Sequence, residues 1–156
     1  MLNQLNCKEA KWKLDYIGMD DYGSMVFFYP DAIKHHKNKD GKPPWWEGHK
    51  DKNGRVIGSH GQIFMECELH LFDHSKPLII YEGEKDAFIS PLQGISFSGG
   101  ATAIPKSIDA LYDFEKIIIV YDNDKAGTEG AEKLAHRIKL DKPEIDIRIA
   151  QWDSSL

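Results

Sequence analysis

Residues 78–86 read LIIYEGEKD and residues 117–127 read IIIVYDNDKAG, and these two stretches decide the fold. Each begins with a continuous apolar run, which is typical of a strand that is covered on both faces. Each run is followed at once by acidic residues and then by a helical pattern, over about 84–92 and 131–138. Strands that alternate with helices predict βαβ units, and therefore a mainly parallel sheet with helices on both faces.

Weaker signals surround these two strands. Residues 95–97 predict a short strand, and alternating isoleucines over 145–149 predict a last one. Pro105 is suited to the first turn of a helix, which we expect to run to about Tyr112.

Before residue 76 the pattern is irregular. Residues 25–29 and 32–36 read as strands, and Asp40-Gly41 and Asn53-Gly54 are turn signals. We expect a small basic subdomain of mixed α+β or β-rich structure over residues 1–75, followed by the α/β domain over residues 76–156.

The acidic residues fall where an α/β sheet binds ligands, at the carboxyl ends of its strands. If the two apolar strands are neighbours, Glu82, Asp122 and Asp124 meet at one edge of the sheet. Carboxylate oxygens without histidine or cysteine favour Mg²⁺ or Mn²⁺ over zinc. An alternative is that the acids only cap helices: Asp124 fits an N-cap, and Glu84 suits a helix start.

Composition restricts the class of protein. The chain of 156 residues has a net charge of −5, and no apolar run is long enough to span a membrane. Cys7 and Cys67 form neither a disulfide framework nor a zinc motif, so we expect a cytoplasmic setting. Residues 34–55 hold three acidic and seven basic side chains, the latter being Lys34, Lys37, Lys39, Lys42, Lys50, Lys52 and Arg55. Such a segment suits a phosphate backbone, although a solvated polar loop has the same composition.

The stretches 82–87 (EGEKDA) and 121–127 (YDNDKAG), with SFSGGA at 96–101 between them, resemble the Toprim domain. The resemblance covers about residues 76–150 and is most similar to phage-type and bacterial primases and primase–helicases. It implies a Rossmann-like sheet. Residues 29–37 and 61–64 are weakly similar to the small basic subdomain that precedes Toprim in primases.

The resemblance implies a primase-type nucleotidyltransferase that makes short primers on single-stranded DNA from nucleoside triphosphates. Glu82, Asp122 and Asp124 are the expected catalytic residues and the ligands of Mg²⁺ or Mn²⁺, with Asp86 as a further ligand or a partner of one. Lys34, Lys37, Lys85 and Lys125 are the candidates for contacts with nucleic acid or nucleotide. Template preference and the choice between RNA and DNA products stay open.

Two motifs of larger replication proteins are missing from the sequence. The sequence contains no P-loop and no four-ligand zinc set. We therefore expect a fragment of a larger replication protein, which acts at the replication fork in a bacterial or phage setting. A helicase and a zinc-binding or other template-recognition domain would then lie elsewhere in the same chain or in a partner. The alternatives are a Toprim nuclease that cuts phosphodiesters and a non-catalytic nucleic-acid-binding module.

Overall fold

The structure is a computed structural model, and it describes residues 16–21, 23–36, 43–59 and 61–152. The chain forms two compact units, Met1–Ser59 and His60–Leu156. The functional division that the sequence suggests at residues 75 and 76 stays a prediction.

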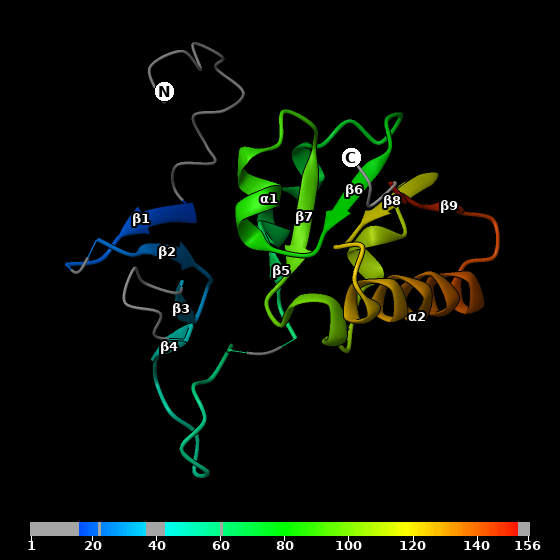
Figure 1. Cartoon of the computed structure of the whole chain (residues 1–156). Coiled ribbons are helices and arrows are strands. Elements are labelled where there is room, and N and C mark those ends of the chain that lie inside the picture. Colours follow the sequence, from blue (N-terminus) through cyan, green and yellow to red (C-terminus); the bar gives the residue numbers. More distant parts are fainter. Residues whose placement is uncertain (1–15, 22, 37–42, 60, 153–156) are drawn as a thin grey trace. The chain divides into compact units, whose positions relative to one another are not determined.

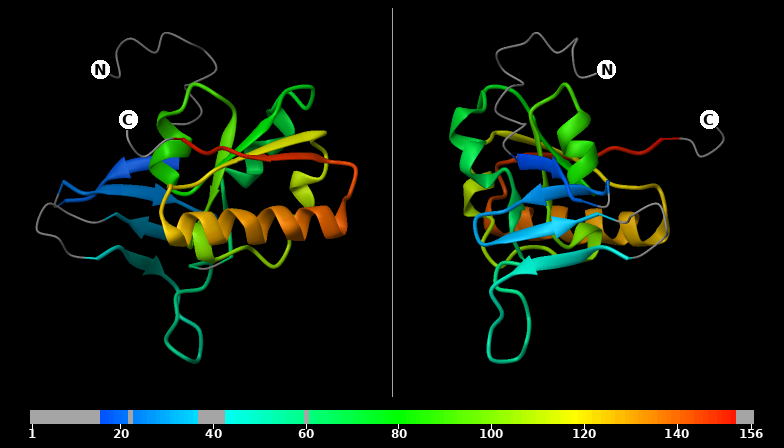
Figure 2. Two further views of the ribbon diagram at one scale, coloured as in Figure 1. Left: turned by 45° about the vertical axis from the view of Figure 1, so that its right-hand side comes forward. Right: turned by 90° about the vertical axis from the view of Figure 1, so that its left-hand side faces the viewer.

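The N-terminal unit contains a four-stranded antiparallel sheet in the order β1-β2-β3-β4. Figure 2 shows these four strands side by side. Their bounds are β1 Ile17–Met19, β2 Met25–Phe28, β3 Ala32–His35 and β4 Trp45–Gly48. One face is well packed, since Phe27 is fully buried and Ala32 nearly so. The expected β-rich character of this region is therefore confirmed.

The C-terminal unit contains a five-stranded sheet in the order β5-β7-β6-β8-β9. Strands β7, β6, β8 and β9 are parallel, and β5 pairs with β7 in the antiparallel sense. Their bounds are β5 Ile63–Phe64, β6 Leu78–Tyr81, β7 Gly94–Phe97, β8 Lys116–Val120 and β9 Asp146–Ile149. This confirms the predicted α/β fold, with β5 as an unexpected antiparallel addition.

Helices α1 (Glu84–Ile89) and α2 (Lys125–Asp141) cover opposite faces of this sheet (Figure 1). The Tyr81 hydroxyl and Ser90 at the end of α1 form a hydrogen bond of 2.5 Å, which places α1 on the face of Tyr81. The apolar side of α2, with Leu134 and Ile138 fully buried, covers the other face, to which Ile117 and Ile119 of β8 belong. Within the described residues, no helix has the length and apolar character to cross a membrane.

The described part of this unit also contains three 3₁₀ turns: η4 (Glu66–Leu71), η5 (Gly100–Thr102) and η6 (Asp109–Leu111). The helix expected from Pro105 to Tyr112 is wrong, because only η6 forms there. Ile108, Leu111 and Phe114 are at most 1% exposed, and their spacing of three residues fits a 3₁₀ turn better than an α-helix. The backbone before η6 is instead held by Arg137 of α2, which donates to the carbonyl oxygens of Pro105 (2.7 Å) and Lys106 (2.5 Å).

Helix α1 also ends earlier than expected. The sequence suggested a helix to about Leu92, but α1 ends at Ile89 and Ser90 adopts an extended backbone with ψ 137°. Pro91 explains this, because the residue before a proline is disfavoured in the helical region.

Replacing Arg137 by Met is expected to lower the free energy of unfolding by about 1–2 kcal/mol, because two backbone carbonyls lose a charged donor. Urea denaturation measures this change. Lys133→Met is the matched control, since Lys133 is an exposed residue of the same helix, and its effect should stay within about 0.5 kcal/mol. Equal stabilities of the two variants would contradict the assigned role of Arg137.

Candidate metal centre

The candidate site lies at the carboxyl ends of β6 and β8. These strands are neighbours in parallel register, with Tyr81 opposite Val120. Glu82 directly follows β6, and Asp122 follows β8 after Tyr121. The two acids therefore leave the sheet at the same edge, although they are 40 residues apart in the chain.

A hydrogen bond joins these two positions. The backbone N–H of Asp122 donates to Glu82 Oε2 at 2.9 Å. This bond fixes the Glu82 carboxylate against the start of the β8–α2 loop. The carboxylate of Asp122 is exposed, so it is open to a ligand.

The electrostatic state of Glu82 reflects its neighbours. Burial raises the pKa of Glu82, and the charges of Asp122, Asp124 and Asp86 raise it further, while the hydrogen bond from Asp122 lowers it. Three neighbouring carboxylates therefore repel the charged form of Glu82. A cation at this edge would relieve that repulsion and favour the charged form of Glu82.

Asp124 and Asp86 lie at the starts of the two helices, Asp124 before the first turn of α2 and Asp86 within the first turn of α1. Asp124 is the N-cap of α2, and its Oδ1 accepts a hydrogen bond from the Gly127 N–H at 2.7 Å. The capping role considered for Asp124 is thus confirmed. Asp86 is an exposed residue in the first turn of α1.

The residues fit a divalent metal by their chemistry. Carboxylate oxygens are the ligands that Mg²⁺ and Mn²⁺ prefer. Within the part of the chain that the structure describes, no three histidine, cysteine, aspartate or glutamate side chains are already arranged as a closed ligand set. The assignment of Glu82, Asp122, Asp124 and Asp86 as ligands therefore stays a prediction.

Comparison with known proteins identifies the domain that carries this edge. Residues 79–155 match the model of a family described as Toprim-like. This segment is a Toprim-like domain. Toprim-like domains generally use a divalent metal, which agrees with the carboxylates at the edge of β6 and β8.

One curated relative and one solved structure are similar to this chain. The chain is 33% identical over 110 residues to a DNA helicase/primase of Enterobacteria phage T3, and the match covers 63% of this chain and 19% of that protein. The fold of this chain is similar to that in the crystal structure of a DNA primase domain from Pseudomonas aeruginosa, with a TM-score of 0.58 and 16% sequence identity. That likeness covers 90% of this chain and 50% of the primase domain. The chain thus spans about a fifth of the phage protein and half of the primase domain.

The predicted basic residues that the structure describes lie on three different elements. In the Toprim-like domain, Lys85 and Lys125 are exposed in the first turns of α1 and α2, and Lys125 lies 3.8 Å from Glu129. Lys34 belongs to β3 of the N-terminal unit, where its Nζ lies 5.8 Å from the centre of the Trp46 ring. Lys37 lies outside the described residues. Their proposed contacts with nucleic acid stay predictions.

Gly127 is a position of close packing that the sequence did not reveal. An ideal Cβ at this residue would lie 2.0 Å from the backbone oxygen of Asp122 and 3.0 Å from Glu82 Oε2. The first turn of α2 can therefore approach the acidic edge of the Toprim-like domain only because residue 127 lacks a side chain. The signal in the sequence is a glycine three residues after Asp124, but spacing alone does not show what it contacts.

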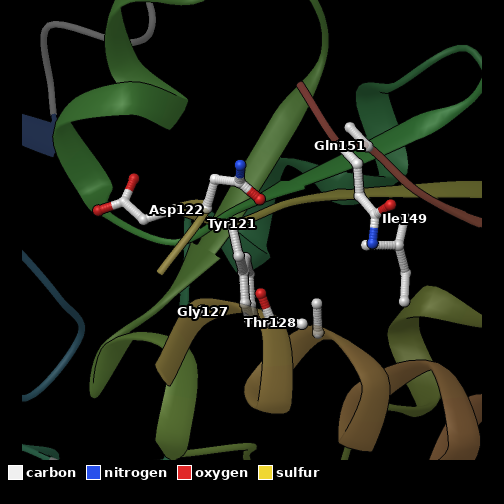
Figure 3. A pocket seen from close by; sticks show the side chains of 9 residues that line it. Tyr121, Asp122, Gly127, Thr128, Ile149 and Gln151 are labelled. Carbon is white, nitrogen blue, oxygen red and sulfur yellow. The ribbon is translucent and has the colours of Figure 1, made fainter. Parts of the chain in front are cut away.

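Tyr121 was likewise read only as the end of a strand. Tyr121 directly follows β8, and its side chain extends toward the start of α2 near Thr128, beside a small pocket, while the Asp122 carboxylate points to the other side (Figure 3). The Tyr121 hydroxyl is buried without a hydrogen-bond partner among the described residues. Burial, followed by the charge of Glu82, raises its pKa, so the ring stays neutral beside the acids.

Proposed function

We propose that this chain is the catalytic core of a primase, which joins nucleotides into short primers on a single-stranded DNA template. One observation carries the proposal: Glu82 and Asp122 are hydrogen-bonded at the carboxyl edge of two adjacent parallel strands. This edge belongs to a Toprim-like domain, and the matched phage relative is a DNA helicase/primase. The proposal extends to nucleoside triphosphates as substrates.

The proposed reaction is attack of a primer 3′-hydroxyl on the α-phosphate of the incoming nucleotide, with release of pyrophosphate. Glu82, Asp122 and Asp124 would hold the catalytic metal, and Asp86 would bind it directly or through one of them. A bound Mg²⁺ or Mn²⁺ supplies charge neutralisation at the phosphates and lowers the pKa of the attacking hydroxyl.

The chain itself supplies position and orientation. The Asp122 N–H holds Glu82 in place, and the Gly127 N–H holds Asp124 at the start of α2. Both bonds come from backbone groups of one short segment, residues 122–127, so the two carboxylates keep a fixed relation to each other. Pre-positioned groups of this kind lower the barrier without reorganisation during the reaction.

The proposed function also requires partners, which would be other domains or proteins of a replication complex. A helicase is the expected neighbour, because the phage relative is a DNA helicase/primase. A zinc-binding or other template-recognition domain would select the start site. Lys34, Lys37, Lys85 and Lys125 remain the proposed contacts with phosphates, and the setting is the replication fork.

Primer synthesis by the purified chain tests the function. Single-stranded DNA, labelled ribonucleotides and Mg²⁺ or Mn²⁺ are expected to yield short labelled products, and chelation of the metal should abolish them. A parallel reaction without nucleotides contains labelled DNA. Cleavage of that DNA would replace the proposal by a Toprim nuclease. DNA binding without synthesis, cleavage or Mn²⁺ binding would indicate a non-catalytic module.

A further inference from the structure

The two adjacent tryptophans of β4 have different environments. Trp46 is half-buried and packs against Tyr29, with ring centres 5.3 Å apart. Trp45 is 48% exposed, and its ring stacks on His35 at 3.6 Å with an angle of 14° between the planes. The structure therefore assigns packing to Trp46 and leaves Trp45 at the surface.

His35 is held firmly beneath Trp45. It is 6% exposed, and each of its ring nitrogens faces a carboxylate. Nδ1 lies 2.9 Å from Asp20 Oδ2, and Nε2 lies 3.1 Å from Glu47 Oε2. Asp20 is itself fixed, because its Oδ1 accepts the N–H of Ser24 at 2.8 Å. The imidazole thus has a fixed plane, and it sets the plane of the indole that stacks on it.

The part of the chain that the structure describes stacks on one face of the Trp45 ring. His35 covers a single face, and no other ring stacks on Trp45 among the described residues. The strand registers place Phe28, which is 37% exposed, on the same side of the sheet as His35 and Trp45. A flat aromatic surface that is held in advance costs little conformational entropy on binding.

The shape of the Trp45 ring and the charge of its sequence segment indicate which ligand would stack there. An unpaired nucleobase is a flat ring that stacks on an indole, and such stacking tolerates any base. The sequence segment that contains Trp45, residues 34–55, carries seven basic and three acidic side chains, which suits a phosphate backbone. Three of the basic residues, Lys37, Lys39 and Lys42, lie outside the described residues. We propose that Trp45, positioned by His35, is a stacking platform for an unpaired base of single-stranded nucleic acid. The proposal rests on the proposed function for the kind of strand, but it requires no catalysis.

Two oligonucleotides separate stacking from charge. A fluorescent oligothymidine and an abasic strand of equal length have the same phosphates, but only the first has bases. Trp45→Ala is expected to weaken binding of oligothymidine by about 5- to 150-fold, the range for one stacked base. Binding of the abasic strand should not change. The dependence of log affinity on log salt should keep its slope, because phosphate contacts are unaffected.

Three further variants sharpen the test. Trp152→Ala removes an indole of similar exposure, 46%, from the other unit and should leave the affinity unchanged. Trp45→Phe should retain part of it, because phenylalanine still stacks. His35→Gln should weaken oligothymidine binding when Trp45 is present and have no further effect in Trp45→Ala. That dependence distinguishes positioning of the indole from a general loss of structure.

The outcomes keep this proposal separate from the proposed function. Unchanged oligothymidine binding by Trp45→Ala would overturn the platform, as would an equal loss for both strands. If the losses occur as expected but the chain makes no primers, the platform stands and the catalytic assignment fails. If the chain makes primers and Trp45→Ala binds oligothymidine normally, the catalytic assignment stands and the stacking platform fails.

Discussion

The Asp122→Asn variant is expected to lose primer synthesis by about 100-fold or more, because several kcal/mol of charge stabilisation depend on the proposed metal. The fold should persist. The Asp122 carboxylate is exposed, and the bond that holds Glu82 comes from the backbone N–H, which asparagine retains. The measurement is the rate of primer synthesis with Mg²⁺, combined with calorimetric binding of Mn²⁺ and circular dichroism.

Asp113→Asn is the matched control for this variant. Asp113 is exposed in the same unit, next to the end of η6 and away from the strand ends that carry the acids. The control should bind Mn²⁺ and make primers as the unchanged chain does. Full primer synthesis and undiminished Mn²⁺ binding by Asp122→Asn would rule out the metal assignment.

Gly127→Ala is expected to destabilise the C-terminal unit by about 2–3 kcal/mol, through overpacking and loss of a helix cap. Inside a helix, alanine is normally more favourable than glycine by about 1 kcal/mol. Here the new Cβ would lie 2.0 Å from the Asp122 backbone oxygen. Backbone atoms must move to make room, which also disturbs the bond between Asp122 and Glu82. Urea denaturation gives the stability change, and primer synthesis should fall with it.

The control for Gly127→Ala is Glu129→Ala in the same helix. Glu129 is exposed and forms only a long contact of 3.8 Å with Lys125. Its replacement should change stability by no more than about 0.5 kcal/mol. If Gly127→Ala were as stable as Glu129→Ala, the close approach of α2 to the acidic edge would be incorrect.

The elements that were predictable from sequence are those with unambiguous patterns. Strands β6 and β8 are apolar on both faces, and α2 repeats its apolar residues with helical spacing. Strands β1, β4 and β5 have no such pattern, and their pairing partners rather than their composition make them strands. Pro105 is an ordinary helix start. However, Arg137, which is distant in sequence, donates to the carbonyl oxygens of Pro105 and Lys106, which would accept backbone hydrogen bonds in a helix.

The candidate site was predictable in outline for a similar reason. Acids after two buried strands meet at one edge whenever those strands are neighbours, and β6 and β8 are. The contacts within the site were not predictable. The hydrogen bond from Asp122 to Glu82 and the close contacts of Gly127 depend on the position of α2. The stacking of Trp45 on His35 depends on the register of β3 and β4, which the irregular pattern before residue 76 does not reveal.

The order of strands in the C-terminal sheet has a kinetic consequence. Strand β6 lies between β7 and β8, although both follow it in the chain. The bond between Glu82 and Asp122 closes a loop of 40 residues, for which the entropic cost is about 3 kcal/mol. Contacts of this range form slowly, after local helices and turns. The acidic edge therefore forms only when β8 pairs with β6. A nascent chain whose synthesis has not passed β8 contains Glu82 but not yet Asp122 and Asp124.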